Sequence, residues 1–354
     1  MLPCIPAPPN LKAMASHRSC WGATTRPSTL GYFLLFLGGR LDWLATYPDS
    51  FFHPTPGLAA WLPGFPPLIL AWTLAIFSFV CTTALFFGFR TPWASRGMAL
   101  GPFVFYVLVQ GFGKNDHTML IALCPLLMSF SGWGQCWSMD AGRRQAPPKA
   151  EAWPIAILAL VIGFLWMTAG LFKALGGWLE FDSFAVQANV LAYGIASGHE
   201  SFLNPQLFES LPDGLLEALD WGVVFFEILF FPSAFFPKLF RLWIFAAITL
   251  HLGIFLYMGF DFSTFVLCYM PLFAWNGVNW KASGGKSPLG KIRIGLFLGI
   301  LLLLLTLYLP YGAPYQAMKH LLHLKSGFWL GFLSLLTFWL GCGVLGVLGL
   351  RRKA

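Results

Sequence analysis

Residues 153–176, WPIAILALVIGFLWMTAGLFKALG, form the stretch that decides the fold. The run is apolar almost throughout, and its one charged side chain, Lys173, comes near the end. About 20 apolar residues are enough for an α-helix to cross the hydrocarbon part of a bilayer. The stretch therefore predicts a transmembrane helix.

Similar apolar runs lie on both sides of this one. They cover approximately residues 29–48, 66–89, 97–113, 118–134, 214–236, 239–260, 262–279, 292–310 and 327–349. The composition agrees, because 57% of the 354 residues are hydrophobic and only 10% are charged, whereas roughly a quarter of the residues in soluble domains are charged. We predict an all-α integral membrane protein, a polytopic helical bundle of about nine or ten spans.

The basic residues predict how these spans are oriented, because Lys and Arg concentrate in cytoplasmic loops. With a cytoplasmic N-terminus, most loop cations, including Arg90 and Arg96, fall on the inner side, and only Lys114, Lys319 and Lys325 fall outside. We expect both termini to be cytoplasmic, and a bacterial inner membrane, since neither terminus resembles an organelle signal. The net charge of +8 thus reflects topology, and nucleic acid is not expected as a partner.

The chain is predicted to have three parts. Residues 1–28 contain prolines and basic residues but no apolar core, so we expect a disordered cytoplasmic segment rather than a signal peptide. Residues 29–280 form the main membrane domain, and residues 281–354 add further spans and a basic cytoplasmic tail. Within the membrane domain, the outer segment 177–213 has no Lys or Arg and predicts amphipathic structure at the outer interface.

Ionisable and polar side chains within or between the apolar runs are candidates for function, because a charge near the middle of a bilayer costs about 2.5–3.5 kcal/mol. The predicted directions place Arg40 and Lys173 in the outer halves of their spans and Glu227 and His251 near the middle. The turn that contains Asn115, Asp116 and His117 lies on the outer side. We expect these side chains to converge on one cavity open to the outer face.

Each candidate also has a structural interpretation. An ammonium group in an apolar pocket is poorly solvated, which would make Lys173 a base; alternatively, its long stem lifts the charge to the outer interface. His251 is a catalytic group or a neutral imidazole bonded to a neighbouring helix. Instead of a functional role, His117 could simply belong to a structural turn. Arg40 could belong to a structural ion pair. No His-x-x-x-His or Glu-x-x-His spacing occurs, so we predict no metal site.

Four local patterns stand in order between residues 30 and 280. They are Phe51-Phe52-His53-Pro54-Thr55-Pro56-Gly57; Lys114-Asn115-Asp116-His117, a span and then Cys136-Trp137-Ser138-Met139-Asp140; Ala169-Gly170-Leu171-Phe172-Lys173 with Trp178; and His251-Leu252-Gly253-Ile254-Phe255-Leu256-Tyr257-Met258-Gly259. Together they resemble the membrane domain of the vitamin K-dependent gamma-carboxylases, part of the wider HTTM (horizontally transferred transmembrane) family.

The resemblance implies a quinone-linked enzyme. Lys173 matches the base that deprotonates reduced vitamin K, whose reaction with oxygen yields the strong base used on glutamate, and His117 and His251 match supporting polar residues. The expected substrate is reduced vitamin K or menaquinone, which suits a pocket open to the bilayer. The expected quinone-binding residues are Asn115, Asp116, Arg40 and Glu227.

The resemblance is to a short form of the family. Gamma-carboxylases continue into a large lumenal domain that binds the protein substrate, whereas here two more apolar spans and a basic tail follow residue 280. The resemblance therefore supports carboxylation of peptide glutamate less strongly than it supports quinol chemistry. Two alternatives stay open: a non-enzymatic maturation or export factor whose outer segment 177–213 binds a secreted peptide or toxin, and a transporter.

Overall fold

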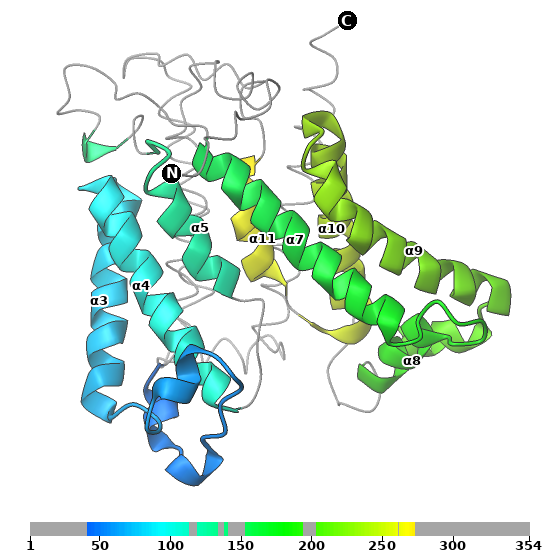
Figure 1. Ribbon diagram of the computed structural model, residues 1–354, viewed down its shortest axis with the longest axis horizontal. Helices are drawn as coiled ribbons and strands as arrows, with labels where there is room; N and C mark the ends of the chain where they lie inside the picture. The colour runs from blue at the N-terminus through cyan, green and yellow to red at the C-terminus, as the bar shows by residue number, and fades with distance from the viewer. Residues whose placement is uncertain are drawn as a thin grey trace, which may run out of the picture. The chain divides into compact units, whose positions relative to one another are not determined.

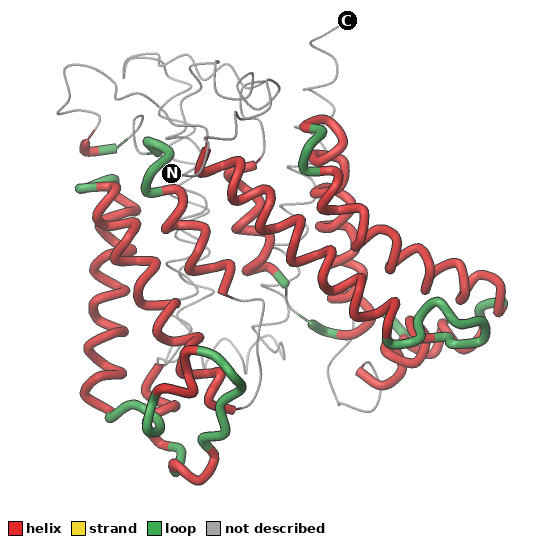
Figure 2. Tube along the Cα trace, in the orientation of Figure 1, coloured by secondary structure: helices red, strands yellow, loops and turns green. Residues whose placement is uncertain are grey.

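The computed structural model describes residues 41–112, 119–133, 138–140, 153–193, 203–260 and 262–272. Figure 1 labels the α-helices in these ranges, and Figure 2 shows them joined by loops. No strand occurs in the described ranges. The all-α prediction is confirmed for this part of the chain.

The α-helices are α3 (Leu68–Phe87), α4 (Thr91–Val109), α5 (Leu120–Met128), α7 (Trp153–Leu175), α8 (Ala185–Leu191), α9 (Asp213–Ser233), α10 (Pro237–Met258) and α11 (Ser263–Tyr269). Short 3-10 helices are η1 (Leu41–Thr46), η2 (Asp49–Phe51), η3 (Leu58–Trp61), η4 (Gln110–Phe112), η7 (Pro205–Ser210) and η8 (Met270–Leu272). Helices α3, α7 and α10 contain segments that are long and apolar enough to cross a membrane. They lie in the predicted spans 66–89, 153–176 and 239–260.

Two other predicted spans contain helices that are shorter than expected. Helix α5 has 9 residues in the run 118–134, and α11 has 7 in the run 262–279. At 1.5 Å per residue these helices are roughly 14 and 11 Å long, less than the thickness of a bilayer. Gly132, at a φ of +74°, follows α5, and Pro271 lies in η8 after α11. Both residue types interrupt regular helical backbone.

Several predictions concern residues outside the described ranges. They are the N-terminal segment 1–28, the spans 292–310 and 327–349 with the tail in 281–354, and most of the first span, 29–48. The chain divides into two compact units, and the division between Ile155 and Ala156 falls inside the predicted membrane domain 29–280.

In the unit that contains α3 and α4, a carboxylate stabilises the turn between these helices by hydrogen bonds. Asp140 accepts hydrogen bonds from the backbone N–H groups of Arg90 and Thr91, at 3.0 and 2.7 Å, and from the Thr91 hydroxyl at 2.9 Å. It thereby satisfies N–H groups at the start of α4 that have no partner within the helix. Gly88, at a φ of +69°, ends α3 and packs against Ser138. Ser138 and Asp140 of the carboxylase-like pattern therefore have a structural role here.

In the unit that contains α7 to α11, helix α7 approaches α9 very closely at Gly170. A Cβ atom at this position would lie 2.8 Å from the Cβ of Glu227 and 2.9 Å from the backbone nitrogen of Ile228. A similar approach occurs two turns earlier, where a Cβ at Gly163 would lie 3.0 Å from the Cα of Phe231. Small residues permit such close packing of helices in membranes. This packing sets the position of Glu227 relative to the end of α7.

Candidate functional site

Lys173 lies in the last turn of α7, where the chain reverses. The N–H of Gly176 donates to the carbonyl of Phe172 at 2.9 Å, and Gly177 follows at a φ of +87°. The turn brings Trp178 back over the helix end, and its N–H donates to the Lys173 carbonyl at 3.2 Å. The Lys173 ammonium then lies 5.4 Å from the centre of the Trp178 ring, within the range of a cation–π interaction.

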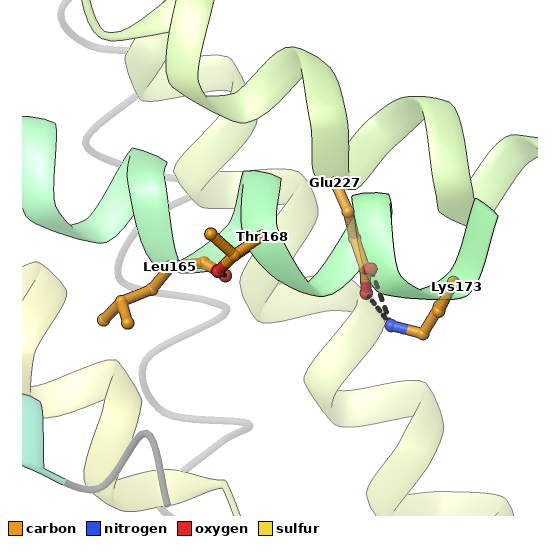
Figure 3. A network of polar contacts seen from close by, with 4 residues as sticks. All are labelled: Leu165, Thr168, Lys173 and Glu227. Carbon is orange, nitrogen blue, oxygen red and sulfur yellow. Dashed lines mark hydrogen bonds and ion pairs between the residues drawn. The ribbon is translucent and has the colours of Figure 1, made fainter. Parts of the chain in front are cut away.

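The carboxylate of Glu227 receives this ammonium. Nζ of Lys173 on α7 lies 2.6 Å from both carboxylate oxygens of Glu227 on α9, as Figure 3 shows. The Lys173 side chain is 27% exposed and that of Glu227 only 6%. Taking a carboxylate out of water costs several kcal/mol unless a partner compensates for it. The ion pair supplies that partner, and Lys173 is the member of the pair that an outside molecule can reach.

This pairing changes what Lys173 can do chemically. In the ion pair, Nζ of Lys173 donates to both carboxylate oxygens of Glu227, so the ammonium has no free lone pair to accept a proton. The free proton-accepting position in the pair is therefore the carboxylate of Glu227. A proton taken from a bound molecule at Nζ can pass to Glu227, so that the ammonium persists beside the anion that forms.

His251 lies in a separate cluster of aromatic rings in the same unit. Its ring, on α10, is 6% exposed and stacks on Phe262 with the centroids 4.6 Å apart. The Trp166 indole donates to the Tyr269 hydroxyl at 3.0 Å, and Nε2 of His251 lies 3.4 Å from that same oxygen. Indole can only donate, so the Tyr269 proton is free to point at Nε2. The arrangement suits a neutral imidazole bonded to α11.

Trp166, a member of the aromatic cluster, lies on the same helix, α7, as Lys173. It stacks on Phe230 of α9 with the centroids 5.2 Å apart, and it lies about two turns before Lys173 on the same face of the helix. Thus Lys173 and Glu227 are in direct contact, whereas His251 lies in a separate cluster about two turns along α7. Arg40, Asn115, Asp116 and His117 lie outside the described residues, so their predicted share in the site stays a prediction.

Asp220 is an important residue that the sequence prediction missed. Its side chain is fully buried on α9 and accepts hydrogen bonds from the Ser183 hydroxyl and from the N–H groups of Ala185 and Val186, at 2.7–2.8 Å. The bonds tie the start of α8, part of the predicted outer segment, to α9. The signal was present in the sequence, since Asp220 is a carboxylate within the apolar run 214–236.

Among the described residues, no group of three or more His, Cys, Asp or Glu side chains is placed to hold a metal ion. Comparisons of the chain with protein-family models, with curated proteins and with solved structures give no match.

Proposed function

We propose that the protein is a polytopic membrane enzyme of about nine or ten spans, with both termini in the cytoplasm of a bacterial cell. The composition and the three apolar helices α3, α7 and α10 support the membrane location. Helices α4 and α9, with 19 and 21 residues, overlap two further predicted spans. The distribution of Lys and Arg supports the orientation.

We propose further that its substrate is a reduced quinone such as reduced vitamin K or menaquinone, and that Lys173 and Glu227 remove a proton from the quinol hydroxyl. The pair at 2.6 Å, with an accessible ammonium and a buried carboxylate, is the observation that carries this proposal. A quinol has an apolar tail and a weakly acidic head. The apolar helices suit the tail. The Glu227 carboxylate, which a ligand reaches past the Lys173 ammonium, suits the acidic head as a proton acceptor.

The proton balance of the step is simple. The quinol hydroxyl gives its proton to Nζ of Lys173 as an Nζ proton passes to Glu227, so the products are the quinolate, an ammonium and a carboxylic acid. The ammonium stays beside the new oxyanion and stabilises it electrostatically. The Trp178 ring, with its centre 5.4 Å from Nζ, also restrains the ammonium.

The test supplies membranes that contain the protein with reduced menaquinone and oxygen, and measures loss of the quinol and formation of its epoxide. The double variant Lys173→Met/Glu227→Leu removes both charges together, so neither is left buried alone. We expect its turnover to fall at least about 100-fold, the usual size of an acid–base contribution.

The matched controls change one lysine and one glutamate that are exposed in the same unit, Lys238→Met and Glu209→Gln. Both should keep full turnover. Equal epoxide formation by the double variant and the controls would contradict the proposal, as would no epoxide from any folded protein.

A second candidate is a non-enzymatic maturation or export factor that binds a secreted peptide. The outer segment favours it, because Asp220 holds this segment in place while Phe181 stays 78% exposed. Under this hypothesis a small exported peptide co-purifies with the protein, and Lys173→Met/Glu227→Leu leaves peptide maturation intact while Phe181→Ser weakens it.

A further inference from the structure

The guanidinium group of Arg96 is held in a fixed position on α4. Its central carbon lies 5.0 Å from the centre of the Trp93 ring and 4.7 Å from that of the Phe130 ring, both within cation–π range. Nε donates to the hydroxyl of Ser129, a buried residue, at 3.3 Å. Two rings and one hydrogen bond therefore hold the guanidinium in place.

This geometry leaves the donor edge of the group available. Arginine has five N–H donors, and Nε uses one of them on Ser129. In the part of the chain that the structure describes, the four N–H groups of the two terminal nitrogens have no hydrogen-bond or ion-pair partner. Arg96 is half-buried, so its charge is only partly compensated by water. The group is organised to receive an anion.

The side chains around Arg96 indicate which kind of anion the group binds. The rings that hold or adjoin Arg96 are apolar and face outward: Trp93 is 69% exposed, Phe130 41% and Trp153 44%, with Phe130 and Trp153 in contact at 5.5 Å. Large aromatic side chains gather where a membrane protein meets the boundary of lipid and water. An anion that reaches Arg96 beside these rings is best carried by a molecule with an apolar part.

We propose that Arg96 and its aromatic neighbours bind the phosphate of an anionic phospholipid in the cytoplasmic leaflet. The inference rests on the membrane location and orientation proposed above, but not on the quinol chemistry. The planar fork of the guanidinium binds two phosphate oxygens at once, a geometry that an ammonium cannot match. The negative surface potential of a cytoplasmic leaflet attracts basic residues, and Arg90 and Arg96 are assigned to that side.

The experiment is native mass spectrometry of the purified full chain, titrated with phosphatidylglycerol or with phosphatidylcholine of the same acyl chains. We expect the unmodified protein to bind phosphatidylglycerol at least about 10-fold more tightly, which corresponds to about 1.4 kcal/mol. Arg96→Gln should abolish this preference, and Arg96→Lys, which keeps the charge but not the fork, should reduce it. Arg90→Gln, an exposed arginine near the start of the same helix, is the matched control and should keep it.

Each other outcome counts against the proposal. An unchanged lipid preference in Arg96→Gln or Arg96→Lys would overturn the site, and so would an equal loss in Arg90→Gln. If Arg96→Gln does not fold, Arg96→Lys decides the result. Displacement of the lipid by glycerol phosphate at an equal concentration would show that the site takes a soluble phosphate, which overturns the assignment to lipid. The quinol assay is independent, so failure of one proposal does not decide the other.

Discussion

Lys173, in the last turn of α7, and Arg96, in the second turn of α4, are two cations in different units of the molecule, and they are compensated in opposite ways. Lys173 has a protein carboxylate at 2.6 Å and a ring beside it. Arg96 has two rings and a hydroxyl, but no carboxylate among the described residues. Of these two cations, only Lys173 is therefore neutralised from within the described chain. The first therefore suits proton transfer, and the second suits an external anion.

The largest expected effect comes from breaking the paired cation alone. Lys173→Met leaves the Glu227 carboxylate buried without its partner, so we expect a loss of about 3 kcal/mol in the free energy of unfolding. Lys173→Met/Glu227→Leu should recover most of it, because no charge is left in the apolar interior. Thermal unfolding in detergent micelles measures both. Equal stability of the single and double variants would show that the pair is not coupled.

A smaller effect is expected at Asp220, where backbone N–H groups take the place of a cation. Asp220→Asn removes the negative charge that receives the bonds from Ser183, Ala185 and Val186, for an expected loss of about 2 kcal/mol. Limited proteolysis should then cut the chain faster near residues 181–186. Asp213→Asn, at an exposed position on the same helix, is the control and should leave the cutting rate nearly unchanged.

A third change disturbs the pair without touching either charge. The added methyl group of Gly170→Ala would meet Glu227 and the backbone of Ile228, so α7 and α9 must move apart. We expect a loss of stability of about 1–2 kcal/mol, typical of overpacking, and a lower quinol turnover. Gly222→Ala is the matched control, since nothing lies within 4 Å of a Cβ there, and it should be neutral or stabilising. Normal turnover in Gly170→Ala would mean that the spacing of the pair is not critical.

The smallest effect is expected when Arg96 loses its charge. Without anionic lipid, Arg96→Gln gives up contacts with Trp93 and Phe130 but strands no buried carboxylate, so we expect a loss of about 1 kcal/mol or less. Thermal unfolding in phosphatidylcholine micelles measures it. A loss as large as that of Lys173→Met would remove the contrast between the two cations and would point to an internal counter-charge for Arg96.

Hydropathy was sufficient to predict the helices whose apolar runs are uninterrupted. Helices α3, α7 and α10 follow the runs closely, because burial in lipid demands both length and continuous apolarity. Helix α4 begins at Thr91, before the predicted residue 97, because Asp140 satisfies the N–H groups of its first turn from a distant part of the chain. Helices α5 and α11 end at Met128 and Tyr269, inside their apolar runs, and a hydropathy average does not resolve these ends.

The candidate site was predictable residue by residue but not as an arrangement. Charged residues within apolar spans are candidates for function, and this rule identified Lys173 and Glu227 separately. Their contact joins positions 54 residues apart and depends on how α7 and α9 are aligned, which no apolar run encodes. Gly170 carries part of that information, since only a small side chain fits between the helices. Asp220 was accessible to the same rule as Glu227.

The sequence separation within the pair has a consequence for biogenesis. Trp178 follows Lys173 almost at once, whereas Glu227 is made 54 residues later. At translation rates of about 5–20 residues per second, roughly 3–11 seconds separate their emergence from the ribosome. During that interval the Lys173 side chain is present without its carboxylate partner. Of the two groups that contact the Lys173 ammonium in the folded protein, Trp178 is therefore present seconds before Glu227.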